Sequence, residues 1–92
     1  MSLEPGPLEL ALRREFAATV GESRVVVRQA VDLADSGLYE ADVGVPLTNE
    51  VVLEELTDAP HGTLADRWNW WMGALEVAYT GYAQFGIQRY RR

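Results

Sequence analysis

The chain contains a single histidine, His61, which is the residue type best suited to acid–base chemistry near neutral pH. Asp58 and Asp66 flank it, and their carboxylates could orient it as a general base or join it as metal ligands. One imidazole with two carboxylates is a small ligand set, and no serine lies in a recognisable nucleophile motif. We therefore expect no catalytic residue, no metal and no cofactor. A metal-assisted enzyme around His61 is kept as an alternative.

A second candidate site combines an aromatic ring with a carboxylate. Trp70 offers a π face and Glu76 offers a negative charge, a pair that suits a small cation or a flat ligand. Adjacent carboxylates such as Glu54 and Glu55 can perform acid–base work, but on a short helix they are typical of a solvated face. We keep a ligand pocket at Trp70 and Glu76 as an alternative function.

The third candidate is the basic end of the sequence, Arg89, Arg91 and Arg92 around Tyr90. Arginine next to an aromatic ring can bind phosphates and stack on bases. The chain has a formal net charge of −6, however, and residues 29–66 contain acids but no arginine, so they repel nucleic acid. We expect the basic end to contact acidic residues of a chain, and keep a nucleic-acid-associated regulator as an alternative.

Helices must position these residues. The length of 92 residues fits a single domain, and the apolar spacing favours an all-α fold, a small bundle of about four helices. After an irregular lead-in over residues 1–7, the predicted helices cover residues 8–20, 24–36, 48–57 and 64–90. Runs of β-branched residues leave an α+β alternative, with a short strand at Val25–Val27 or Val43–Val45.

Capping residues mark where three of these helices begin. Ser23 and Thr48 can cap the second and third helices through their hydroxyl oxygens. Thr63 and Asp66 form a capping-box variant at the start of the last helix, with Asp in place of the usual Glu. Gly21 supplies a stop for the first helix.

The last helix has the strongest periodic signal of the chain. Apolar residues recur along it at spacings of three and four, and we expect them to form a packing and interface surface: Trp68, Trp71, Leu75, Ala78, Tyr82 and Phe85. An unbroken helix over residues 64–90 would be about 40 Å long, whereas a monomer of this size is about 32 Å across. Either the helix breaks at Gly81 or Gly86, or a second chain covers it. We favour the second chain, and thus a homodimer.

The overall composition is acidic and contains arginine but no lysine. An acidic surface of this kind suits a salt-rich cytoplasm, where charge repulsion is screened. No secretory signal is visible near Met1, and the most apolar window, residues 70–88, carries Glu76 and Gln84. We expect a cytoplasmic, non-enzymatic interaction or adaptor protein that binds itself or another protein, and no membrane.

Two segments of the last third, Arg67–Gly73 and Ala78–Tyr82, resemble small uncharacterised proteins of halophilic archaea. The resemblance implies a salt-rich setting, in agreement with the acidic composition. It implies no activity, and no functional residue is carried over from it.

Overall fold

A computed structural model of the chain describes residues 3–60 and 62–88 and contains five α-helices and one short 3₁₀ helix. The elements are listed in chain order: α1 (Pro5–Phe16), α2 (Val20–Ser36), α3 (Leu38–Val43), α4 (Asn49–Asp58), α5 (Leu64–Tyr79) and η1 (Ala83–Phe85). No strand occurs in these residues. The all-α prediction is confirmed, and the α+β alternative at Val25–Val27 or Val43–Val45 is wrong.

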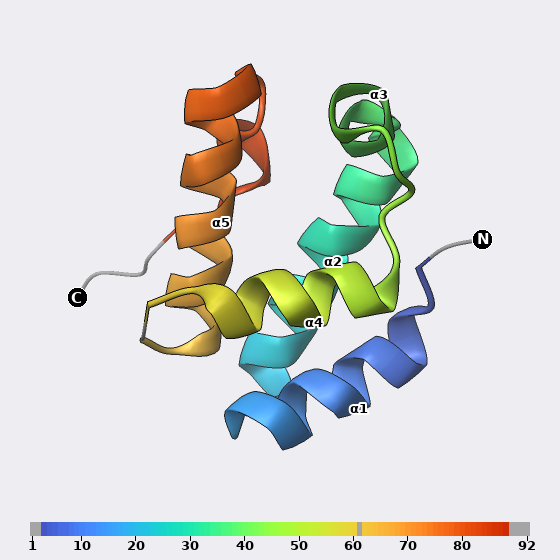
Figure 1. Ribbon diagram of the computed structural model, residues 1–92. Helices are drawn as coiled ribbons and strands as arrows, with labels where there is room; N and C mark the ends of the chain where they lie inside the picture. The colour runs from blue at the N-terminus through green and yellow to red at the C-terminus, as the bar shows by residue number, and fades with distance from the viewer. Residues whose placement is uncertain (1–2, 61, 89–92) are drawn as a thin grey trace.

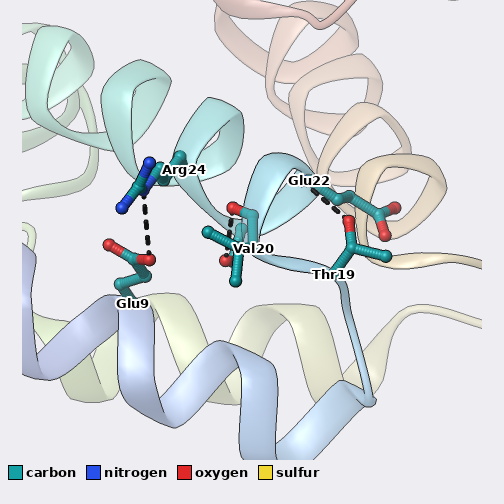
Figure 2. Close-up of polar contacts among 6 residues, drawn as sticks. Glu9, Thr19, Val20, Glu22 and Arg24 are labelled. Carbon is teal, nitrogen blue, oxygen red and sulfur yellow. Dashed lines mark hydrogen bonds and ion pairs between the residues drawn. The ribbon is translucent and has the colours of Figure 1, made fainter.

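The first two helices do not begin and end where their sequences predict. Helix α1 begins at Pro5, because proline suits the first helical turn, and it ends before Ala17, which adopts the left-handed conformation with φ of 53°. Helix α2 is capped by Thr19, whose Oγ1 accepts a hydrogen bond of 3.1 Å from the main-chain N–H of Glu22 (Figure 2). The predicted cap Ser23 is instead buried inside α2.

The start of α2 is tied to both α1 and α5. Arg24 of α2 forms an ion pair of 3.5 Å with Glu9 of α1 (Figure 2). Glu22 accepts a hydrogen bond of 2.9 Å from the main-chain N–H of Ala65, in the first turn of α5. This carboxylate therefore lies at the N-terminus of α5, where the helix dipole favours negative charge.

The β-branched run 25–27 is helical because the tertiary structure buries part of it. Val26 and Val27 are buried together with Ala30 and Leu33 on one side of α2. Burial of apolar surface outweighs the small helix penalty of β-branched residues.

Helix α3 lies between the second and third predicted helices, in a segment for which no helix is predicted. Gly37 and Gly44 bracket it, with φ of 73° and 95°, so each glycine ends a helical segment in the left-handed conformation. Tyr39 of α3 is buried in the core.

The start of α4 agrees with the sequence prediction. Thr48 accepts a hydrogen bond from the N–H of Val51, as its capping role requires.

Arginine at position 67 connects α4 to α5. Its guanidinium donates hydrogen bonds to the main-chain carbonyls of Leu56 at 2.9 Å and Ala59 at 3.2 Å, at the end of α4. The same group lies 5.3 Å from the centre of the Phe16 ring at the end of α1. One side chain thus joins the ends of two helices to the beginning of a third.

One apolar core contacts all of these elements. In Figure 1, α1 and α4 lie across the lower half of the view. Helix α2 starts near α1 and passes behind α4, and α5 rises from the end of α4. The largest fully buried side chains are Trp68, Tyr82, Leu8, Leu12, Leu33, Leu56, Leu64 and Met72.

Helix α5 begins as the sequence predicts and ends eleven residues earlier than the predicted Tyr90. Thr63 and Asp66 form the predicted capping box. The helix stops at Tyr79, and the chain turns at Thr80 and Gly81, with φ of 66° and 95°. The following residues fold back against α5, on its side toward α2 (Figure 1). The unbroken helix over 64–90 is therefore wrong, and the longest dimension of the chain is 32 Å.

Candidate functional site

Residues 82–87, which we call the return segment, are held on α5 by side chains that bind their main chain. Trp68 is fully buried, and its indole Nε1 donates a hydrogen bond of 2.8 Å to the carbonyl oxygen of Phe85. Asn69 donates from Nδ2 to the carbonyl of Ile87 at 2.8 Å and accepts from the N–H of Ile87 at 2.7 Å. The Asn69 amide thus makes the two hydrogen bonds with Ile87 that the main chain of a neighbouring strand would make.

Glu76 holds the other end of the return segment. Its Oε1 accepts hydrogen bonds from the main-chain N–H groups of Tyr82 at 2.7 Å and Ala83 at 3.0 Å. These donors, with Tyr82 contributing most, lower the pKa of Glu76. The carboxylate therefore satisfies two donors that follow the end of α5.

Tyr82 connects the return segment to α3. Its ring is fully buried, and its hydroxyl donates a hydrogen bond of 2.9 Å to Oδ2 of Asp42. Burial, followed by the hydrogen bond and the negative charge of Asp42, raises the pKa of Tyr82. The phenol is therefore neutral at physiological pH and acts as a donor.

The predicted packing surface lies in the core of its own chain. Trp71 makes edge-to-face contacts with Trp68, at 5.4 Å between ring centres, and with Tyr39 of α3, at 5.8 Å. Leu75, Tyr82 and Phe85 are buried as well, and Ala78 is exposed. Tyr82 and Phe85 join this cluster from the return segment rather than from a continued helix.

The opposite side of α5 is exposed and uncharged. We define the outer face of α5 as Trp70, Gly73, Ala74 and Val77, all of which are solvent-exposed. Trp70 is 45% exposed and Val77 is 88% exposed. Large apolar side chains at this exposure, next to small ones, are typical of a contact surface.

The proposed ligand pair is not brought together. A groove of about 560 Å³ lies between α5 and the return segment, and it is lined by Glu76, Asn69 and Gly73 but not by Trp70. Because Glu76 already accepts two main-chain hydrogen bonds, it does not serve as a free counter-charge.

The remaining candidates give no further site in the part of the chain that the structure covers. His61 and the basic residues Arg89, Arg91 and Arg92 lie outside the described residues. Among residues 3–60 and 62–88, no group of three His, Cys, Asp or Glu side chains could hold a metal ion. In the same residues, no helix reaches the length and apolar content that crossing a membrane requires.

Comparison with known proteins identifies the family. Residues 1–76 match the family model described as the WNWW domain, and this chain belongs to that family. No curated protein and no solved structure matches the chain significantly. The match does not test the resemblance to proteins of halophilic archaea, which stays a prediction.

The letters of the family name are the one-letter sequence of residues 68–71 in this chain. Trp68 and Trp71 fill the core, and Asn69 binds the return segment. Trp70 differs from the other three, because nearly half of its surface is exposed on the outer face of α5. Sequence reasoning missed the role of Asn69, although an amide between tryptophans on an apolar helix signals a specific hydrogen-bond partner.

Proposed function

We propose that this protein is a non-enzymatic, homo-oligomeric interaction protein, and that two copies pair through the outer face of α5. The observation that carries the proposal is the exposure of Trp70, the one residue of the 68–71 tetrapeptide that is solvent-exposed in the fold. Tryptophan is enriched among the residues that dominate binding energy at protein interfaces. The predicted stripe around Trp71 fills the core instead, so the proposed interface uses the other side of the same helix.

The order of residues along this face supports pairing with a second copy. If two α5 helices cross in an antiparallel manner, with the two-fold axis between Gly73 and Ala74, Trp70 lies opposite the partner's Val77. The small residues Gly73 and Ala74 meet at the crossing point and allow the backbones to approach closely. A large residue, two small ones and a medium one in this order make the face complementary to itself.

Charge favours the same surface. The chain has a net charge of −6, so two copies repel each other over most approaches. The outer face carries none of the acidic residues, and depletion of charge is a property of interface cores. This acidic exterior also fits the expected salt-rich cytoplasm, which is part of the same proposal.

The size of the face sets the expected strength. One helix face is smaller than the roughly 800 Å² that each partner contributes to a stable interface. We therefore expect a reversible dimer that dissociates on dilution through the micromolar range.

The test is the particle mass measured by light scattering during size-exclusion chromatography over a dilution series. Val77→Asp places a charge opposite Trp70 of the partner and is expected to give monomer at concentrations where the parent is dimeric. Leu10→Asp is the matched control, because Leu10 is also exposed, at 57%, but lies on α1. Equal masses for Val77→Asp, Leu10→Asp and the parent at every concentration would refute the pairing.

A further inference from the structure

We propose that Trp68, Asn69 and Glu76 form a binding site for a main-chain segment, and that the site accepts the return segment of a second copy in exchange for its own. The exchange opens the chain at Thr80 and Gly81. This inference does not depend on the pairing of outer faces, because Trp68, Asn69 and Glu76 are not part of the outer face.

The chemistry of the site is recognition of a peptide backbone. Trp68 donates to one carbonyl, Asn69 binds both main-chain groups of Ile87, and Glu76 accepts two N–H groups. None of these bonds requires that the segment belong to the same chain. A second copy supplies an identical segment, including the Tyr82 and Phe85 side chains that fill the core.

The connection to the return segment is strained in the closed chain. Thr80 has φ of 66° and ψ of 157°, and a β-branched residue rarely adopts a positive φ. Gly81 follows with φ of 95°, a conformation that glycine accepts readily. The turn lies at the end of α5 farthest from α4 (Figure 1).

The sequence at this turn allows an open form. No proline lies between Tyr79 and Tyr82, so α5 can continue through Thr80 and Gly81 while residues 82–87 keep the conformation of the return segment. If α5 continues past Thr80, the strain at Thr80 is released and Tyr82 leaves its own core. The exposed core surface is then covered by the return segment of another copy, which restores the same hydrogen bonds.

The closed and exchanged forms therefore contain the same contacts. Their free energies differ chiefly through the conformation of the turn and the entropy cost of joining two chains. Residues at the turn should set the balance. Thr80→Gly relieves the strain of the closed form and is expected to lower the exchanged fraction about tenfold. Gly81→Ala disfavours positive φ and favours helix, so it is expected to raise that fraction. A methyl group at Gly81 would meet only Leu38 Cδ2 at 3.5 Å, which is ordinary contact.

The experiment uses cysteine pairs in a chain that has no cysteine of its own. Gly73→Cys and Gln84→Cys place thiols on opposite sides of the groove between α5 and the return segment. A short bismaleimide then joins them within one chain in the closed form and between two chains in the exchanged form. Denaturing gels separate the two products. Gly73 also belongs to the outer face, so face pairing could bring together the two thiols introduced at this position. All cysteine variants therefore also carry Val77→Asp, which is expected to prevent face pairing, so that a covalent dimer reports exchange.

The parent pair, incubated at high protein concentration before cross-linking, is expected to give a covalent dimer that increases with Gly81→Ala and decreases with Thr80→Gly. Circular dichroism is expected to show more helix in the dimer fraction than in the monomer. Cross-links confined to single chains in all three backgrounds would overturn the proposal, as would equal dimer yields from Thr80→Gly and Gly81→Ala. The Thr80→Gly variant keeps the test valid even if Gly81→Ala folds poorly.

Discussion

The side-chain amide of Asn69 binds both main-chain groups of Ile87, which lies eighteen residues further along the chain, at 2.8 and 2.7 Å. An amide side chain carries both an N–H donor and a carbonyl acceptor, so it can bind the carbonyl and the N–H of one residue at the same time. The identity of residue 69 is therefore tied to the position of the return segment.

Asn69→Asp tests this pair of bonds. The carboxylate still accepts from the N–H of Ile87, but it cannot donate to the Ile87 carbonyl and places negative charge beside it. We expect a loss of about 2 kcal/mol in the free energy of unfolding, measured by urea denaturation at neutral pH. Gln88→Glu, an exposed amide-to-acid change in the same groove, is the control and should have little effect.

Trp68→Phe removes the buried indole N–H that binds the carbonyl of Phe85. The carbonyl loses its donor, and the smaller ring leaves unfilled space in the core. Together these effects should reduce the free energy of unfolding by about 2 to 4 kcal/mol. Trp70→Phe is the comparison, because nearly half of the Trp70 surface is exposed. Similar melting temperatures for the two variants would contradict the assigned roles.

Glu76 makes stability depend on pH. Its pKa is lowered in the folded chain by the N–H groups of Tyr82 and Ala83 from an ordinary value of 4.5. The ionised carboxylate therefore contributes stability above about pH 4.5, and this contribution is lost as the pH falls through the lowered pKa. Thermal melts from pH 7 to pH 3 should show a smaller acid-induced decrease for Glu76→Gln than for the parent. Parallel curves would argue against the two hydrogen bonds.

Glu55 is expected to act in the opposite direction. Burial, followed by repulsion from Asp58 and Glu54, raises its pKa, so its charged form is less stable in the folded chain than in the unfolded chain. The penalty is absent when Glu55 is protonated and grows as the pH rises through the raised pKa. Glu55→Gln should therefore increase the melting temperature slightly at pH 7 and have little effect near pH 3. A decrease at pH 7 would show that the carboxylate is favourable.

Local signals predicted the beginnings of two helices. Thr48 caps α4, and Thr63 with Asp66 forms the capping box of α5. Each of these signals involves residues within one turn of each other, so the sequence contains the whole interaction. The helical class was predictable for the same reason, since periodicity is a local property of the chain.

The end of α5 was not predictable, because it depends on distant residues. Tyr82 and Phe85 continue the helical spacing of α5. Both side chains are buried in the core, however, and belong to a segment that runs back along α5. What selects the turn is the contact of Tyr82 with Asp42, forty residues earlier, and the hydrogen bonds of Phe85 and Ile87 to α5. The spacing of apolar residues is the same in both arrangements, so periodicity does not distinguish them.

The return segment also constrains the order in which the protein matures. It is the last described part of the chain to leave the ribosome. Until it emerges, the Trp68 indole has no acceptor and the core lacks the Tyr82 and Phe85 rings. The helices that emerge earlier therefore expose aromatic surface during translation. A translational pause before residue 82 would therefore prolong the interval in which that aromatic surface can aggregate.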